Sequence, residues 1–217
     1  MSNTDIRGAL ANAIAYLKAH PDDARYTDSA ATAVLESGLA VMVRGPQGVS
    51  IHTDMPKSVG GSDQSPSPGW LLRAAQASCL ATLIAMRAAQ QGLEPGRIEV
   101  VVDSESDDRG ILGIDDSVPA GPMSSRARVR IGGNGTSPEQ LAALVRWADA
   151  HCPVQDAVRR AVPCTVERDN KGKPHRGYGP RTEWLTRSCG ASSSPSVHSL
   201  GNTLRTPAAE RNQATTT

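Results

Sequence analysis

The fold is decided by residues 65–92, which read SPSPGWLLRAAQASCLATLIAMRAAQQG. Ser67 suits the N-cap of a helix, Pro68 suits its first position, and Gly92 suits its end. Between them, apolar residues recur on nearly every face of a helix, so little polar face is left. A helix of this kind is usually buried on most sides. The sequence therefore predicts a central core helix over residues 68–91.

Short segments on both sides of this helix have the character of β-strands. Before it, three runs rich in β-branched residues and separated by turn residues predict an antiparallel meander at residues 31–35, 39–44 and 49–53. After it, polar and apolar residues alternate with the period of a strand that has one face in water. These later segments are residues 97–105 and 126–131, with further short strands expected at 111–114 and 165–167.

Three more helices complete the expected architecture. Residues 1–20 contain an amphipathic N-terminal helix, and a capping-box sequence at Ser137 opens another. A shorter helix begins near Cys152-Pro153. Strands that flank a buried helix in this order predict an α+β fold in a single domain over residues 1–168.

The composition changes abruptly after Arg168. Residues 169–217 are rich in Ser, Thr, Asn, Gly and Pro and poor in large apolar residues. Such a segment buries too little apolar surface to offset the entropy lost on ordering, so we expect a disordered C-terminal tail. Cys189 lies in this tail, and we expect no function for it.

The charge balance excludes some partners. The 217 residues include 23 Lys and Arg against 22 Asp and Glu, a formal net charge of +1. This balance predicts no long-range attraction to nucleic acid or to an anionic membrane. The first residues lack the pattern of a secretory leader, and Arg73 and Gln76 interrupt the apolar helix, so we expect a cytoplasmic protein. There, cysteines stay reduced rather than forming structural disulfides.

Two cysteines lie in unlike surroundings that the fold could bring together. Cys79 is inside the apolar helix, where desolvation opposes ionisation, so it is a nucleophile only if a cation lies close by. Cys152 precedes Pro153 at a helix start, where the helix dipole favours a thiolate below the usual pKa of about 8.5. Taken separately, each has a simpler interpretation: a core residue for Cys79 and a helix cap for Cys152. Cys164 is predicted to be a small core residue.

The residues around both cysteines resemble the OsmC/Ohr family of thiol-dependent peroxidases. The resemblance rests on the loop at residues 60–68, on residues 71–79, and on His151-Cys152-Pro153-Val154 further along the chain. Asp54-Met55-Pro56 and the downstream pair of strands fit the same pattern. It covers residues 27–168, which is most of the predicted domain.

This resemblance implies an OsmC-like fold, an intertwined homodimer whose antiparallel sheets wrap two long central helices, with active sites at the subunit interface. It implies that Cys79 is the peroxidatic thiolate, which attacks an organic hydroperoxide and becomes a sulfenic acid. Cys152 is then the resolving thiol, which condenses with it to a disulfide that an external dithiol reduces. No metal or cofactor is implied.

The sequence also departs from the family pattern. Strongly active members carry a glutamate just after the proline that opens the central helix, and it orients an arginine that stabilises the thiolate. Gly69 and Trp70 occupy those positions here, and the early strand region that carries the arginine offers none. Arg44 and Arg73 are possible substitutes, although Arg73 lies on the face of the helix opposite Cys79. Trp70 is expected to serve in core packing, and the alternative is that it lines an altered pocket.

Two histidines are further polar candidates. His52 and Asp54 occupy alternate strand positions and are expected to point the same way, but the sequence offers no third metal ligand. His151 adjoins Cys152, and we expect it to be solvated.

Three hypotheses follow from these residues. The first is an antioxidant OsmC-like oxidoreductase, a homodimer that reduces organic hydroperoxides through Cys79 and Cys152 at the expense of a dithiol. The second is a non-catalytic protein that binds a small apolar ligand on the same scaffold after losing the glutamate–arginine pair. The third is an interaction protein that acts through its tail.

Overall fold

A computed structural model describes residues 2–133 and 135–168 of the chain. Contacts divide the chain into two units, Met1–Thr182 and Glu183–Thr217, and every described residue belongs to the first. The tail predicted at residues 169–217, with Cys189, lies outside the described residues.

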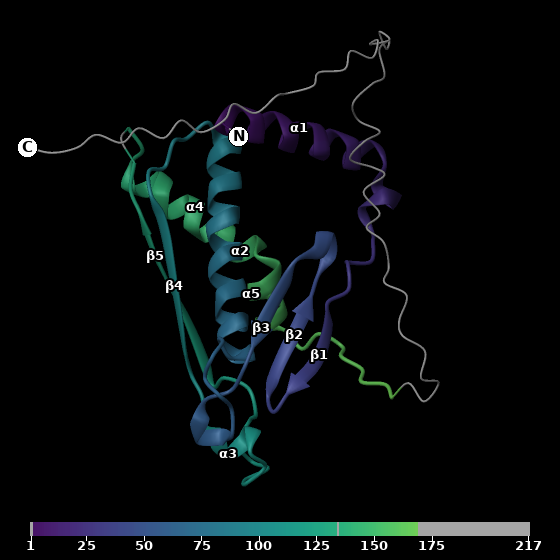
Figure 1. The fold of residues 1–217 in the computed structure, drawn as a ribbon. Helices are drawn as coiled ribbons and strands as arrows, with labels where there is room; N and C mark the ends of the chain where they lie inside the picture. The colour runs from purple at the N-terminus through teal and green to yellow at the C-terminus, as the bar shows by residue number, and fades with distance from the viewer. Residues whose placement is uncertain (1, 134, 169–217) are drawn as a thin grey trace, which may run out of the picture. The chain divides into compact units, whose positions relative to one another are not determined.

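The helices and strands follow one another in a mixed α+β order (Figure 1). Along the chain they are α1 (Asn3–Ala19), β1 (Thr32–Ser37), β2 (Ala40–Arg44), β3 (Ser50–Thr53), α2 (Pro68–Gln91), β4 (Ile98–Glu105), α3 (Asp108–Ile111), β5 (Ser124–Ile131), α4 (Pro138–His151) and α5 (Pro153–Arg159). Short 3₁₀ helices occupy Pro21–Ala24, Pro46–Gly48 and Lys57–Val59.

The central helix α2 begins and ends where its capping residues predict. The hydroxyl of Ser67 accepts a hydrogen bond from the backbone N–H of Trp70 at 3.2 Å, and Pro68 occupies the first turn. At the other end Gly92 adopts a left-handed conformation with φ of 69°, which ends the helix at little steric cost. The predicted bounds of this helix are confirmed.

One side of α2 forms the hydrophobic core. β4 and β5 run alongside the helix, and α4 lies behind it (Figure 1). The fully buried apolar residues of this cluster come from α2, from α4 and from the junction after α4; they are Leu80, Ile84, Ala88, Leu144, Ala148 and Cys152. The apolar faces of β4 and β5 pack against this cluster with Val100 and Val129.

The other side of α2 is open in the single chain. Ala75, Ser78 and Thr82 are exposed, and Trp70 is 49% exposed. The expectation of a helix buried on most sides therefore holds for one side only, and the expectation that Trp70 packs in the core is wrong for one chain. Within residues 2–133 and 135–168, no element covers the second side of α2.

Two antiparallel sheets confirm the predicted strand pairs. In the first, the order is β1–β2–β3, with Val43 opposite Ala33 on one neighbour and Ile51 on the other. In the second, β4 pairs with β5 so that Ile98 lies opposite Ile131. The polar face of this second sheet carries ion pairs of three arginines with two acids: Arg126 and Arg128 with Asp103, and Arg130 with Glu99.

The N-terminal helix α1 crosses the C-terminal end of α2 (Figure 1). The Nε of Arg7 donates to the carbonyl oxygen of Ala89 at 2.8 Å, and the Nδ2 of Asn3 donates to that of Leu93 at 3.2 Å. These bonds satisfy carbonyl groups at and just after the end of α2 that have few partners within the helix itself.

Two predicted strands are wrong. Ile111 is the last residue of the short helix α3, and residues 112–114 follow it without forming a strand. The helix starts here because the carboxylate of Asp107 accepts a hydrogen bond from the backbone N–H of Arg109 at 3.0 Å and so caps the first turn. Residues 165–167 pair with no strand of the described chain. Their β-branched residues favour an extended chain, but a strand also needs a hydrogen-bonded neighbour.

Candidate redox site

Cys79 and Cys152 lie against each other. Cys79 is half-buried in the middle of α2, whereas Cys152 is only 1% exposed at the junction of α4 and α5. Cys79 packs against the core cluster that includes Cys152, and the Cys152 thiol and the backbone N–H of Val154 are near enough to act on the pKa of the Cys79 thiol. Both cysteines are free thiols. The structure therefore brings together the two residues that the sequence singled out.

The local sequence explains how Cys152 reaches Cys79. Cys152 ends α4 and precedes α5 with an extended backbone, φ −76° and ψ 114°, because Pro153 disfavours a helical conformation in the residue before it. Its side chain makes no capping hydrogen bond with α5. Cys152 therefore occupies the cap position that the sequence predicts, but its thiol makes no capping bond and is available to face the core helix.

The surroundings of Cys79 disfavour its thiolate. Burial raises the pKa of the Cys79 thiol above its ordinary value, and the hydrogen bond and charge of Cys152 act in the same direction. The Val154 N–H opposes them, because it donates to the sulfur and so favours the charged form. Within the described part of the chain, no cationic side chain contributes to the pKa of Cys79.

The two candidate arginines lie elsewhere. The Nη1 of Arg73 donates to the hydroxyl of Ser104 on β4 at 3.2 Å, on a side of α2 away from Cys79 as the helical spacing predicts. Arg44 is exposed at the end of β2. A Cβ atom placed on Gly69 would lie 3.9 Å from the Nη1 of Arg73, so a carboxylate at that position would have Arg73 within reach.

The histidines do not join the thiols. His52 points to Glu36, with 3.7 Å between its Nε2 and the carboxylate. His151 stacks on Trp147 with 4.2 Å between ring centroids, and it is exposed as expected. No three His, Cys, Asp or Glu side chains in residues 2–133 and 135–168 are grouped as metal ligands.

Asp54 organises the loop that leads into α2 rather than pairing with His52. It lies just beyond the end of β3, so the alternation of a strand no longer applies to it. Its carboxylate accepts hydrogen bonds from the hydroxyl and N–H of Ser62 and from the N–H groups of Met55 and Gln64. These bonds, led by that of the Ser62 hydroxyl, hold the pKa of Asp54 below its usual range.

Cys164 is not a core residue. It is exposed in the irregular segment that follows α5, so the prediction of a small buried residue is wrong. The apolar run around it predicted burial, but no described element covers that segment.

Sequence reasoning missed a buried polar contact beside the thiols. Gln76, one helical turn before Cys79, is 1% exposed and hydrogen-bonds with Gln155 on α5 and with Ser125 on β5. An amide in an otherwise apolar core face is the signal that could have identified it, because buried polar groups need partners.

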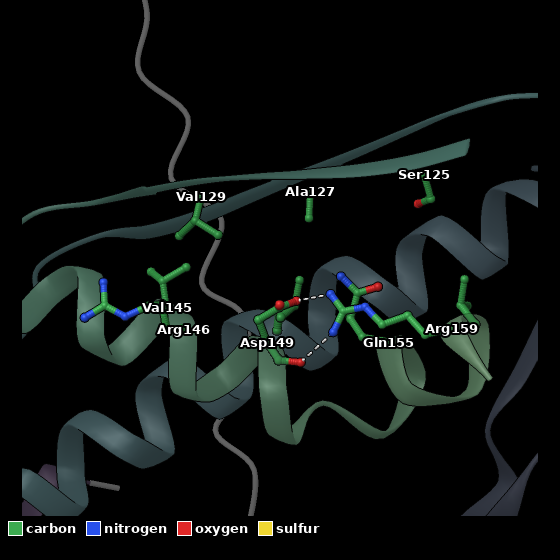
Figure 2. A pocket seen from close by; sticks show the side chains of 10 residues that line it. Ser125, Ala127, Val129, Val145, Arg146, Asp149, Gln155 and Arg159 are labelled. Carbon is green, nitrogen blue, oxygen red and sulfur yellow. Dashed lines mark hydrogen bonds and ion pairs between the residues drawn. The ribbon is translucent and has the colours of Figure 1, made fainter. Parts of the chain in front are cut away.

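A pocket of about 390 Å³ opens between β5 and the helices α4 and α5 (Figure 2). Its lining comprises the apolar residues Leu80, Ala127, Val129, Val145 and Val158 and the polar residues Ser125, Arg146, Asp149, Gln155 and Arg159. Arg159 and Asp149, which both line the pocket, form an ion pair at 2.6 Å (Figure 2).

The fold and the paired thiols define a class of protein: an α+β domain whose central helix presents one cysteine to a second at a helix junction. The sequence model of OsmC-like proteins matches residues 61–167, a segment that includes both cysteines. This match places residues 61–167 in the OsmC-like family, and the resemblance predicted from the two cysteine segments is confirmed. No curated protein sequence matches the chain.

Two solved structures with TM-scores above 0.5 confirm the predicted OsmC-like fold of the single chain. An OsmC-like protein from Mycoplasma pneumoniae has a TM-score of 0.53 at 15% identity, over 62% of this chain and 89% of that one. An OsmC-like protein of unknown function from Vibrio cholerae O1 biovar eltor has a TM-score of 0.52 at 14% identity, over 60% and 93%. The organic hydroperoxide resistance protein OsmC from Legionella pneumophila has a TM-score of 0.47 at 20% identity, over 62% and 91%.

The carboxylate of Asp54 should make stability depend on pH. Because its folded pKa lies below the unfolded value of about 3.9, its contribution is fully present above that pH and is lost as the pH falls through the folded pKa. In urea titrations we expect Asp54→Asn to lower the free energy of unfolding by a constant amount from about pH 7 to 5 and by less below about pH 4.

Asp63→Asn is the matched control. Asp63 lies in the same loop with φ of 59°, which asparagine tolerates, and its carboxylate accepts no hydrogen bond within the described residues. It should show no such pH dependence. A difference for Asp54→Asn that stays constant down to about pH 3 would contradict a role for the charge.

Proposed function

We propose that this protein reduces organic hydroperoxides with Cys79 and Cys152 and acts in the defence against oxidative stress. The observation that carries the proposal is the proximity of the two thiols, since Cys79 on α2 packs against the cluster that includes Cys152 at the α4–α5 junction. Membership of the OsmC-like family supports the same chemistry. Cys79 is the attacking residue because it is half-buried and so remains reachable, whereas Cys152 is enclosed.

In the first step, the Cys79 thiolate attacks the distal oxygen of the hydroperoxide. An S–O bond forms as the O–O bond breaks, the sulfur is oxidised by two electrons, and the peroxide oxygen is reduced. The leaving alkoxide takes a proton from solvent and departs as an alcohol. Cys79 is left as a sulfenic acid.

In the second step, Cys152 attacks the sulfur of that sulfenic acid. An S–S bond forms, the S–O bond breaks, and the hydroxyl group leaves as water with the thiol proton of Cys152. An external dithiol then reduces the disulfide by two thiol–disulfide exchanges and is itself oxidised to a disulfide. The contact between the two cysteines allows this closure before a second peroxide molecule reacts.

A second candidate function rests on what surrounds Cys79. With Gly69 and Trp70 in place of the carboxylate, and no cation among the described residues acting on Cys79, an OsmC-like scaffold would instead bind a small apolar ligand without turnover. The two functions differ in whether Cys79 is consumed by hydroperoxide. Cys79→Ser should leave the affinity for such a ligand nearly unchanged.

We also propose a cytoplasmic homodimer. In the described part of the chain, α2 is the one helix long and apolar enough to cross a membrane, but its contacts with β4 and α4 support a core role. The open side of α2 and the exposed Val34 and Leu35 on β1 are surfaces that a second copy would cover. Reduced thiols persist in the cytoplasm.

Substitution of each cysteine should separate the two steps. With cumene hydroperoxide and dithiothreitol, we expect Cys79→Ser to abolish peroxide consumption, because the attacking sulfur is gone. When no dithiol is present to reduce the sulfenic acid, Cys152→Ser should consume two to three equivalents and then stop. One equivalent forms the sulfenic acid and one is used for each further oxygen atom added to Cys79, which intact mass spectrometry detects. Cys164→Ser, which changes an exposed thiol, is the control and should match the wild type. Full turnover by Cys79→Ser would contradict the assignment.

The pH profile should report the raised pKa of Cys79. Below its pKa the thiolate fraction grows about tenfold per pH unit, so the single-turnover rate of Cys79 oxidation should rise in that way from about pH 6 to 8 without a plateau. Stopped-flow measurement of peroxide loss checks this result. A plateau below about pH 7 would show that a cation outside the described residues stabilises the thiolate.

A charge on the open side of α2 should split the homodimer. Thr82 is exposed on this side, so Thr82→Arg should leave a single chain folded but place a large cation between two packed helices. We expect sedimentation to give twice the mass of one chain for the wild type and the mass of one chain for the variant. Ala142→Arg, on an exposed position of α4, should remain dimeric. A monomeric wild type would contradict the proposal.

A further inference from the structure

Gln76 links three elements from inside the core. Its Nε2 donates to the Oε1 of Gln155 on α5 at 3.1 Å, and its Oε1 accepts from the hydroxyl of Ser125 on β5 at 3.1 Å. The side chain is 1% exposed, and the contact with Gln155 is buried. All three side chains are therefore tied to one arrangement of α2, α5 and β5.

This contact runs beside the pair of thiols. Gln76 precedes Cys79 by one turn on α2, and Gln155 follows Cys152 within the first turn of α5. The helices α2 and α5 are thus joined twice, once by the two amides and once by the two cysteines. Because the amide contact is one turn away, any shift of α5 that breaks it also moves Cys152 relative to Cys79.

The side of α5 that faces β5 depends on these hydrogen bonds. The pocket in Figure 2 lies there, with Gln155 and Ser125 in its lining, so apolar side chains do not fill the space between α5 and β5. The helix α5 is also short, Pro153–Arg159, and has little length over which to pack. A buried amide that loses its hydrogen-bond partner is left desolvated without compensation, which costs free energy. The contact therefore strongly favours one position of α5.

We propose that Gln76 and Gln155 are positioning residues that hold the start of α5 so that Cys152 stays in contact with Cys79 and the disulfide between them closes readily. This role rests on the proposed two-cysteine function and adds to it the groups that set the geometry of the pair. Neither amide touches the reacting oxygen. Both act through the position of Cys152.

The test measures disulfide formation without a hydroperoxide. In glutathione buffers, the two thiols of the protein and one oxidised glutathione give the Cys79–Cys152 disulfide and two reduced glutathione molecules, so electrons and protons balance. Trapping the thiols with a maleimide and weighing the products gives the effective concentration of one cysteine at the other.

We expect Gln76→Met to lower the effective concentration about three- to tenfold, because one positioning hydrogen bond is lost. Gln155→Met should lower it to a similar extent, and the double variant should cost little more than either change alone, because both remove the same contact. Gln90→Met is the matched control, since the one side-chain hydrogen bond of Gln90 among the described residues is with Arg87 on the same helix, and it should equal the wild type.

A general loss of folding stability would not by itself lower the effective concentration in this non-additive way. If Gln76→Met does not fold, the double variant, in which two apolar groups face each other, keeps the measurement possible. An effective concentration equal to that of the wild type in the folded variants would overturn the positioning role, and so would a wild-type protein that forms no Cys79–Cys152 disulfide in these buffers. A wild type that forms the disulfide but consumes no hydroperoxide would overturn the proposed function and leave the positioning role intact.

Discussion

The packing of α2 against the α4–α5 junction is the constraint on which the rest of the site depends. Cys152 is part of the core cluster with Leu80, Ile84 and Leu144, so the same apolar contacts that stabilise the domain also fix the position of this thiol. Burial of such side chains contributes about 1.5–3 kcal/mol each and is not directional. The orientation of Cys152 toward α2 comes from two specific features. Pro153 ends α4 and turns the chain, and the Gln76–Gln155 contact fixes the position of α5 after the turn.

The same burial creates a conflict with reactivity. A sheltered Cys79 meets Cys152 reliably, yet desolvation raises its pKa and lowers the amount of thiolate. The Val154 N–H is the one opposing group within the described chain that acts on this sulfur. Arg73, the nearest candidate in sequence, is bound to Ser104 instead, and Gly69 provides no carboxylate to draw it away. In the proposed dimer a second chain covers the open side of α2 and would complete these surroundings.

Local signals in the sequence predicted the elements well, and long-range contacts explain the failures. Ser67 and Gly92 set the ends of α2 by contacts within a few residues, so both ends were predictable. The predictions of a strand at residues 165–167 and of a buried Cys164 were wrong for the same reason. The composition there favours a strand, but a strand also needs a hydrogen-bonded neighbour, which composition does not specify.

The two thiols were found through their flanking sequences, since neither cysteine alone indicated more than a structural role. Gln76 was missed as a functional residue because its partners, Gln155 and Ser125, come from distant parts of the chain and only the fold brings them together.

The central claim, that Cys79 and Cys152 form one redox pair, is tested most directly by peptide mapping. The reduced protein is treated with one equivalent of cumene hydroperoxide, blocked with a maleimide, digested and analysed by mass spectrometry. The structure predicts a peptide that joins Cys79 to Cys152 while Cys164 stays a free thiol. Both cysteines recovered as free thiols, with the hydroperoxide unspent, would contradict the account.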